Sequence, residues 1–260
     1  MDINHARFSG VARLYGRHAL RRLQEARVMV IGIGGVGTWA AEALARTAVG
    51  RIDLVDLDEV CVTNTNRQLV ATGSTVGRPK AVAMAERLRD IAPGIDARAQ
   101  VRFFTEKSAD ALLEPDIDVV IDAIDSVKHK SLLIRRCREL GLLVVVSGGA
   151  GGRRDPSKVG WADLSEVKGD RLLFTIRKKL RQKHGFPRKG SMGVPAVYSP
   201  EPQVFPTDEG EVCERRGDAA DNLRLDCASG FGTAAMVTGT FGLLAAHLAV
   251  DAVLRAEPTG

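Results

Sequence analysis

Residues 27–49 read RVMVIGIGGVGTWAAEALARTAV. The first part, 27–33, is rich in β-branched apolar residues and ends in glycines, whereas 38–49 carries apolar side chains at helical spacing. This pattern predicts a strand, a tight glycine turn and a helix. The first turn of a helix stabilises an anion through its free N–H groups and its dipole. The candidate phosphate-binding residues are therefore Gly34, Gly35 and Gly37.

An acidic residue follows the next apolar run. Asp56 comes directly after residues 52–55, about 20 residues beyond the glycine turn. A carboxylate at this position can accept hydrogen bonds from both hydroxyls of a ribose. On their own, the glycine turn and Asp56 favour a dinucleotide-dependent oxidoreductase, which would be recognised by its binding of NAD.

The polar stretch after Asp56 points to a different nucleotide. It contains DLD at 56–58, NTNRQ at 64–68 and GRPK at 77–80, which a hydride-transferring enzyme does not need. An arginine grips two phosphate oxygens as a fork, and a lysine places a point charge beside a phosphate. The stretch therefore favours a bound triphosphate, with candidate ligand-binding residues Asp58, Asn64, Arg67 and Lys80.

A second acidic motif, DAIDS at 122–126, follows the strand predicted at 117–121. Both carboxylates are thereby placed at the carboxyl edge of the sheet, where such folds bind ligands. Mg²⁺ takes hard oxygen ligands and is commonly bound by one or two carboxylates together with phosphates. Asp125 is the candidate magnesium ligand, and for Asp122 capping of the following helix is an equal alternative.

Strands and helices alternate along the first part of the chain. Further strands are predicted at 95–101 and 142–146, and helices at 81–91 and 130–140, with a short helix ending at 113. Continuous apolar strands are typical of a parallel sheet covered on both faces. We therefore predict an α/β fold: a Rossmann-like, doubly wound, mostly parallel sheet with helices on both faces and a C-terminal extension packed on it.

Three parts of the chain differ in amino-acid composition. Residues 1–26 form an arginine-rich N-terminal helical arm, 27–152 an ATP-binding Rossmann-like domain, and 153–260 a C-terminal part. The C-terminal part begins with a basic segment, continues through a proline-bearing stretch at 187–206 that we predict as loop, and ends in apolar helices.

The composition sets broad limits. The chain has 260 residues, of which 45% are hydrophobic and 27% charged, so it can bury a large core. The net charge of +5 permits a polyanionic partner without requiring one. The four cysteines contain no CxxC pair and the five histidines show no metal-ligand spacing, so we expect no zinc and no disulfide framework. A reducing cytoplasm is the natural setting.

One segment is long and apolar enough to cross a bilayer. Residues 227–250 contain no Asp, Glu, Lys or Arg. Four glycines, several hydroxyl residues and a histidine within it favour a buried helix of a large α/β domain, and membrane association is the alternative.

The motifs GIGGVG, DLDEVCVTNTNRQ, GRPK and VVIDAIDS resemble the adenylation domain shared by ubiquitin-activating enzymes and the bacterial molybdopterin- and thiamine-pathway adenylyltransferases. This resemblance covers roughly residues 7–152. The additional motifs RFSGVARLYG, SGGAGG and DCASGFGTAAMVT are similar to the tRNA threonylcarbamoyladenosine dehydratase branch of that superfamily, nearly from end to end.

The resemblance implies ATP-dependent cyclisation of the threonylcarbamoyl group on the adenosine beside the tRNA anticodon. It implies ATP and Mg²⁺ as cofactors, a homodimer, and a link to a cysteine desulfurase with its sulfur-acceptor protein. A structural monovalent cation is a further candidate. Carried over by residue, the three glycines cradle phosphate and Asp56 holds the ribose. Asn64, Arg67 and Lys80 bind the triphosphate, Asp125 binds magnesium, and Asp58 is a further nucleotide-binding candidate.

Two departures from the wider superfamily stand out. The paired CxxC zinc motifs of relatives that act on ubiquitin-like tails are absent. Those relatives often supply an arginine from the partner subunit in an RYxRQ motif, but this chain has RFSG at 7–10, with Gly10 where the second arginine would fall. Arg7 and Arg13 are the candidates to replace it.

Two further features are candidates for function. Cys227 precedes a glycine-rich turn and is either a nucleophile or sulfur acceptor, or a small buried residue at the start of a helix. The basic run between 168 and 189 holds nine Lys or Arg against one acid, so it is either a tRNA contact or a solvated helix face. The run comprises Lys168, Arg171, Arg177, Lys178, Lys179, Arg181, Lys183, Arg188 and Lys189.

Two other functions share part of this pattern. An adenylyltransferase for a ubiquitin-like sulfur-carrier protein would share the ATP site, but its pyrophosphate exchange would be stimulated by a protein that ends in Gly-Gly. A sulfur-relay adaptor would load persulfide without ATP.

Overall fold

The computed structural model describes residues 6–207, 210–214 and 231–256. Its centre is a sheet of order β3-β2-β1-β4-β5-β7-β6, in which β6 is antiparallel to β7 and every other neighbour is parallel. The strands are β1 (Arg27–Ile31), β2 (Arg51–Val55), β3 (Asp96–Gln100), β4 (Val119–Asp122), β5 (Leu143–Ser147), β6 (Gly160–Asp163) and β7 (Pro195–Tyr198). Two short strands, β8 (Phe205–Pro206) and β9 (Val212–Cys213), form a separate pair.

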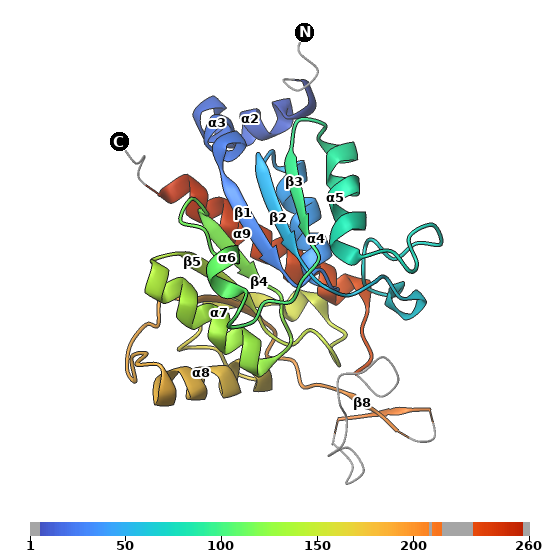
Figure 1. The fold of residues 1–260 in the computed structure, drawn as a ribbon. Helices are drawn as coiled ribbons and strands as arrows, with labels where there is room; N and C mark the ends of the chain where they lie inside the picture. Colours follow the sequence, from blue (N-terminus) through green and yellow to red (C-terminus); the bar gives the residue numbers. More distant parts are fainter. Residues whose placement is uncertain (1–5, 208–209, 215–230, 257–260) are drawn as a thin grey trace.

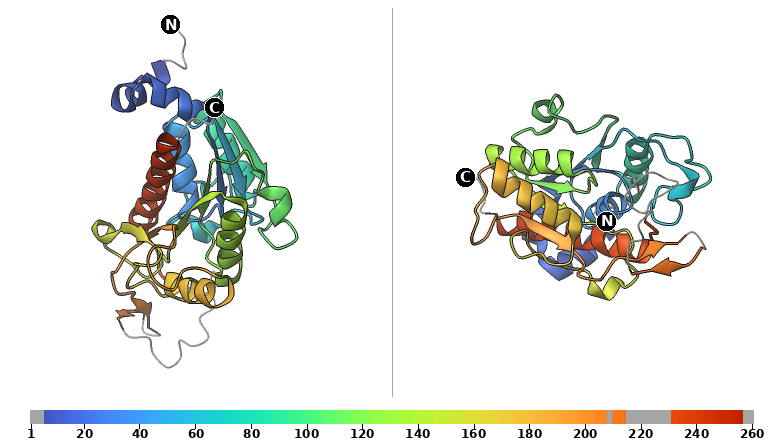
Figure 2. Two further views of the ribbon diagram at one scale, coloured as in Figure 1. Left: turned by 90° about the vertical axis from the view of Figure 1, so that its left-hand side faces the viewer. Right: turned by 90° about the horizontal axis from the view of Figure 1, so that it is seen from below.

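Helices cover both faces of this sheet (Figures 1 and 2). The helices of one face, which share one hydrophobic core, are α3 (Arg17–Glu25), α4 (Gly37–Arg46), α5 (Lys80–Ile91) and α9 (Ala235–Arg255). The helices of the other face, with a second core, are α6 (Ala109–Leu112), α7 (Val127–Leu140) and α8 (Arg171–Lys183). Strands β1 and β4 are buried along their whole length, as expected for a strand covered on both sides. The predicted doubly wound α/β fold is confirmed.

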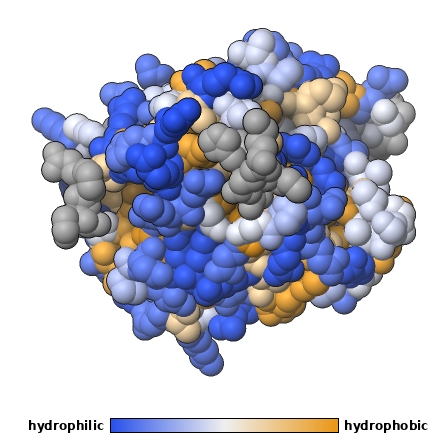
Figure 3. Space-filling model, turned by 90° about the horizontal axis from the view of Figure 1, so that it is seen from above, coloured by the Kyte–Doolittle hydropathy of each residue, from blue (hydrophilic) through white to orange (hydrophobic). Residues whose placement is uncertain are grey.

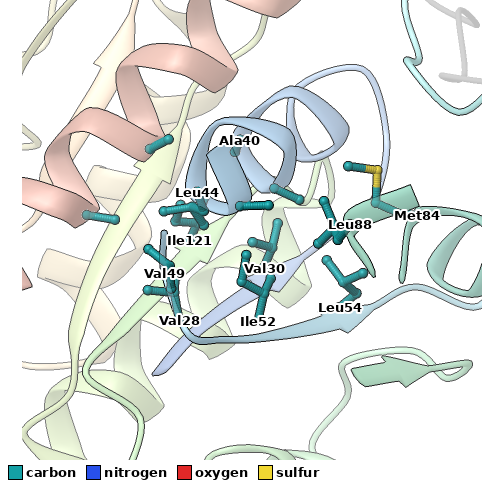
Figure 4. Close-up of a cluster of buried hydrophobic side chains, with 14 of the residues drawn as sticks. Val28, Val30, Ala40, Leu44, Val49, Ile52, Leu54, Met84, Leu88 and Ile121 are labelled. Atoms are coloured by element: carbon teal, nitrogen blue, oxygen red, sulfur yellow. The ribbon is translucent and has the colours of Figure 1, made fainter. Parts of the chain in front are cut away.

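The larger core joins the first two βα units. Side chains from β1, β2 and β4 point toward α4 and α5 in Figure 4. The fully buried ones include Val28, Val30, Ile52, Leu54, Ile121, Leu44 and Leu88. Because each βα unit contributes to the same core, the strands are fixed relative to one another, and so are the loops at their carboxyl ends.

The prediction of a continuous loop over 187–206 is wrong. Within it, β7 lies between β5 and β6, with Ala196 and Val197 fully buried. Proline is tolerated as the first residue of a strand because it is missing only a donor that a strand end does not need. Pro195 occupies that first position, opposite Asp163 at the end of β6. The C-terminal part of the chain thereby extends the same sheet.

Helix α9 is the one helix among the described residues that is long and apolar enough to span a membrane. It contacts α4 and strands β4, β5 and β7, and 61% of its most apolar window is buried in the fold. This is the environment of a core helix, as the glycines and hydroxyl residues predicted. The part of the predicted segment before residue 231 lies outside the described residues.

A glycine sets the distance between α9 and α4. A Cβ atom on Gly242 would lie 2.5 Å from the carbonyl oxygen of Val36 and 2.6 Å from the Cβ of Trp39. We expect Gly242→Ala to destabilise the protein by about 1–3 kcal/mol, because the helices must separate. Gly239→Ala is the matched control: its Cβ would make an ordinary 3.5 Å contact with the Trp39 ring.

Alanine is the better helix former by about 1 kcal/mol, so the control variant is expected to be neutral or slightly stabilised. Chemical denaturation of both variants measures the difference. Equal stability of the two variants would show that this helix crossing is not tight.

The N-terminal arm contains α2 (Ser9–Tyr15) and α3, and lies at the amino ends of the strands (Figure 1). Seen from above, the face that carries it is mostly hydrophilic, with smaller hydrophobic areas between (Figure 3). Leu14 is 74% exposed, and Arg7 donates a hydrogen bond to the carbonyl of Ile91. Within one chain, the arm is therefore on the edge of the sheet opposite to the glycine turn.

Candidate functional site

The candidate site lies at the carboxyl edge of the sheet, where β1 and β4 are neighbours. The chain connects β1 to β2 on one side and reaches β4 on the other, which makes this the topological switch point where doubly wound sheets bind ligands. The turns after the two strands touch. Gly32 has φ of +93°, and a Cβ there would lie 2.8 Å from the carbonyl oxygen of Ala123.

The glycine turn after β1 is compact for a steric reason. A Cβ on Gly37 would lie 1.9 Å from the carbonyl oxygen of Gly32, so only glycine fits at the start of α4. Gly34 has open space on its Cβ side, and Gly35 is half-buried. The first turn of α4 thus presents its N–H groups at the sheet edge, with little side-chain bulk in front of them.

Asp56 is held against this turn by backbone donors. Its Oδ2 accepts a hydrogen bond from the N–H of Ile33 at 2.6 Å, and its Oδ1 accepts one from the N–H of Asp58 at 2.8 Å. Burial raises the pKa of Asp56 above its usual 3.8, against the opposing effects of the Asp58 N–H and the Lys80 charge. The carboxylate is thus fixed in orientation beside the glycine turn, as a ribose-binding acid requires.

Lys80 begins α5 and is nearly buried, with 6% of its surface exposed. Its Nζ forms an ion pair with Oδ2 of Asp58 at 2.9 Å, and its backbone N–H donates to the carbonyl of Asp58. The two predicted residues are therefore partners of one another. Asp58 is half exposed, so the pair faces solvent on its acidic side.

Arg67 lies across the glycine turn. A Cβ on Gly35 would be 3.2 Å from the Cγ of Arg67, so the aliphatic part of the arginine covers this glycine. Its Nη1 donates to the carbonyl of Thr63 at 3.0 Å and to Oδ1 of Asn66 at 2.9 Å. The indole N–H of Trp39, on α4, donates to the carbonyl of Arg67 at 3.1 Å. The arginine and the helix with the free N–H groups are thereby joined.

Asn64 has a local role that the sequence did not reveal. It is buried in the 3₁₀ turn η1 (Val62–Asn64), and its Oδ1 accepts a hydrogen bond from the N–H of Cys61 at 3.0 Å. The side chain closes the turn that carries Arg67. Among the described residues, its contacts place it as a support for the arginine.

Asp125 is exposed in the loop after β4 and accepts no hydrogen bond from the described residues. Among those residues, no group of three or more His, Cys, Asp or Glu is placed to hold a metal ion. A single carboxylate at the phosphate-binding edge still suits Mg²⁺, which usually completes its shell with phosphate oxygens and water. The donor set therefore fits a magnesium ion that arrives with a nucleotide.

Asp122 does not cap the following helix. The N-cap of α7 is Ser126, whose hydroxyl accepts from the N–H of His129. Asp122 is instead fully buried and pairs with Nζ of Lys130 at 2.8 Å, while its Oδ1 also accepts from the N–H of Ile124 at 3.0 Å. This pair holds the start of the DAIDS loop against α7.

The sequence analysis missed Lys130, although a signal was present. The buried face of α7 repeats at helical spacing, and Lys130 stands at a core position among apolar residues. A lysine at such a position needs a buried acid, because an unpaired charge in a core is very costly. Asp122, at the end of the preceding strand, is that acid.

The remaining predicted residues include Cys227 and the basic run. Cys227 lies outside the described residues, so its two interpretations stay open. Arg177 and Arg181 of the basic run bind nearby carbonyl groups, of Leu164 and Val167 and of Pro187 respectively. Lys178, Lys179 and Lys183 make no ion pair with described residues.

Known proteins similar to this chain include tRNA threonylcarbamoyladenosine dehydratases. The tRNA threonylcarbamoyladenosine dehydratase of Escherichia coli (strain K12) is 45% identical over 97% of this chain and 95% of that protein. The crystal structure of the E. coli dehydratase, TcdA, in complex with ATP matches with a TM-score of 0.84 and 41% identity, covering 97% of this chain and 96% of that one. Its complex with AMP matches with a TM-score of 0.85, 42% identity and the same coverage.

The resemblance that the motifs indicated, to the tRNA threonylcarbamoyladenosine dehydratase branch, is thus confirmed over nearly the whole chain. A family model described as "ThiF family" matches residues 8–259. With a glycine turn, a fixed Asp56 and Arg67 at the switch point of the sheet, this chain belongs to the ThiF family.

Proposed function

We propose that this protein catalyses the ATP-dependent dehydration of threonylcarbamoyladenosine in tRNA, by adenylating the threonyl carboxylate and closing a ring. The observation that carries the proposal is the site at the β1–β4 edge, in a chain that matches the ATP and AMP complexes of TcdA over nearly its full length. In the proposed reaction, ATP is consumed in the adenylation step and AMP leaves in the ring closure that follows.

The chemistry solves a leaving-group problem. A carboxylate is a poor electrophile until one of its oxygens becomes a good leaving group. Attack of that oxygen on the α-phosphorus of ATP expels pyrophosphate and gives an acyl-adenylate. A nitrogen or the oxygen of the carbamoyl group then attacks the acyl carbon and displaces AMP, and a carbamoyl N–H proton is lost. The nucleoside has lost one water in total, and ATP has become AMP and pyrophosphate.

This reaction needs positioning and charge neutralisation more than a protein nucleophile. An intramolecular attack in a held geometry has an effective molarity of about 10⁵ M or more. The proposed roles follow from the contacts: the first turn of α4 binds phosphate, Asp56 holds the ribose, and Arg67 neutralises the phosphates. Lys80 is paired with Asp58, and a bound triphosphate would compete with Asp58 for the lysine and be neutralised by its charge.

Mg²⁺, with Asp125 as its protein ligand, would neutralise phosphate charge when it is bound with ATP. The proposal also includes a homodimer in the cytoplasm and, as a link to sulfur metabolism, a cysteine desulfurase with its sulfur-acceptor protein. In the homodimer, Arg7 or Arg13 would come from the partner subunit, because the arm of the same chain lies on the opposite edge.

Mass spectrometry of nucleosides tests the function directly. tRNA that carries threonylcarbamoyladenosine is incubated with the protein, with and without Mg-ATP. A loss of one water from the nucleoside only in the presence of Mg-ATP is the expected result. Pyrophosphate exchange stimulated by a Gly-Gly-ending protein, with no change in the tRNA, would instead identify an adenylyltransferase for a sulfur carrier.

The raised pKa of Asp56 predicts a pH dependence of ATP binding. The ionised carboxylate accepts the ribose hydroxyls, so affinity is lost as pH falls through the pKa of this group. Because that pKa lies above 3.8, the loss begins at a higher pH than for an ordinary aspartate. Titration calorimetry with ATP, compared between the wild type and Asp56→Asn, measures this.

The protonation of ATP itself cancels in this comparison, because both proteins bind the same nucleotide. Asp56→Asn is expected to bind ATP more weakly than the wild type. It is also expected to lack the additional loss of ATP affinity that the wild type shows at acidic pH. Parallel profiles for the two proteins would contradict the role of Asp56.

A further inference from the structure

A hollow of about 570 Å³ lies on the helical face opposite α9, between α7, α8 and the loop at 105–107. Helices α7 and α8 are neighbours in the fold (Figure 1). Its charged lining residues come from three separate segments and are Glu106, Lys107, Lys128, Arg135, Lys179 and Lys183. We refer to it below as the α7–α8 groove.

The groove carries an unneutralised positive charge. Its one acid, Glu106, is paired with Arg135 at 2.9 Å, and this arginine also pairs with Glu139 outside the lining. Its four lysines make no ion pair with any residue of the described ranges. His184, also in the lining, has its pKa lowered by burial and then by the charges of Arg135 and Lys179. A polyanion would be attracted here, and an acidic protein segment or a phosphate chain both have that charge.

Part of the groove lies close to the adenylation site. Lys128 and His129 line the groove and belong to the first turn of α7. Asp125, the proposed metal ligand, precedes Lys128 by three residues and lies in the loop that joins β4 to α7. A molecule that lies in the groove therefore passes close to the carboxyl edge of β4.

The kind of cationic side chain in the groove indicates the kind of ligand. A single phosphate group is usually bound by the N–H groups of a glycine turn or by the fork of an arginine. The groove lysines are flexible point charges on three walls of an open hollow, and the lining arginine is already paired. Lysines spaced in this way suit a chain of repeated single charges, such as a phosphodiester backbone.

We propose that the α7–α8 groove binds the phosphate backbone of the tRNA next to the nucleoside that enters the adenylation site. This inference rests on the proposed function and adds the surface on which the substrate lies. It also limits the predicted tRNA contact of the basic run to the lysines of α8 that line the groove. Lys179 and Lys183 line the groove, whereas the neighbouring Lys178 is exposed and does not.

Adjacent charge reversals test the groove. Lys179→Glu and Lys178→Glu make the same charge change on the same helix, and Lys107→Glu makes it on the opposite wall. Binding of the tRNA substrate is measured by titration at several salt concentrations. We expect Lys179→Glu and Lys107→Glu each to weaken binding about tenfold and to reduce the slope of log K against log salt by about 1. Lys178→Glu is expected to stay within about threefold of the wild type.

Two further measurements separate the outcomes. Thermal unfolding and ATP affinity are expected to be unchanged in all three variants, which excludes misfolding and damage to the ATP site. If Lys178→Glu weakens binding as much as Lys179→Glu, the exposed side of α8 and not the groove contacts tRNA. If neither groove variant changes tRNA affinity while the wild type still dehydrates the nucleoside, the groove proposal fails and the proposed function stands.

Discussion

Arg67→Ala is expected to lower kcat/KM for ATP-dependent dehydration about 10³-fold. The aliphatic part of the arginine lies over Gly35, next to the start of α4, and its guanidinium donates to Thr63 and Asn66. Charge that develops on the phosphates during adenylation would be neutralised there, in a site whose geometry is already fixed. The loss appears in conversion of the tRNA nucleoside, measured by mass spectrometry under single-turnover conditions.

The same variant is expected to fold normally. Its lost hydrogen bonds, to Thr63 and Asn66, lie at the surface and are worth about 1 kcal/mol or less together. The bond from Trp39 goes to the backbone carbonyl, which alanine keeps. A substantial fall in unfolding free energy would mean that Arg67 is a structural residue and would remove the support for a catalytic role.

Arg78→Ala is the matched control for this experiment. Arg78 belongs to the same polar region, but its guanidinium is paired with Glu86 on the surface. We expect its kcat/KM to stay within about threefold of the wild type, as for a surface ion pair. Equal losses in both arginine variants would show a general effect of positive charge and not a specific contact of Arg67.

Lys130→Met is expected to cost about 3–5 kcal/mol of unfolding free energy, the largest stability effect that we predict. Lys130 and Asp122 are both fully buried, and removal of the lysine leaves a buried carboxylate without its counter-charge. The Oδ2 atom of Asp122 already lacks a hydrogen-bond partner among the described residues. Denaturant unfolding followed by circular dichroism measures the loss.

A second substitution separates charge from packing. Asp122→Asn removes the unpaired charge but keeps an oxygen that can accept the N–H of Ile124. The double variant Lys130→Met with Asp122→Asn is therefore expected to recover most of the lost stability. If the double variant is as unstable as Lys130→Met alone, the lysine contributes through its packing and not through its charge.

The fold was predictable from local patterns because each βα unit repeats the same signal. In the first unit, a strand is predicted by the apolar run that ends at Ile31. A turn is predicted by the glycines after it, and a helix by the apolar spacing of α4. The sheet partners of β7 could not be predicted, since its short apolar core lies between prolines. This segment forms a strand only because Ala196 and Val197 lie between β5 and β6 in the sheet.

The candidate site was predictable in its residues but not in their mutual contacts. Arg67 and Asp56 are identified by motif, whereas the pairing of Lys80 with Asp58 depends on how two loops fold back on each other. Asn64 was predicted to bind phosphate, and its Oδ1 is engaged within its own turn, so only its amide NH2 group is left to donate to a phosphate. A motif gives the composition of a site, and the hydrogen bonds of its loops decide which atoms remain available.

Helix α9 covers one face of the sheet, which α3, α4 and α5 bury only in part. Helix α9 packs on β5 and on α4 and β4, the last two of which are made more than a hundred residues earlier. During synthesis, the apolar surface of these early elements stays exposed until α9 has left the ribosome. Folding of the nucleotide-binding half therefore cannot be completed before α9 is made, and a nascent chain that stalls before α9 is expected to need chaperones to avoid aggregation.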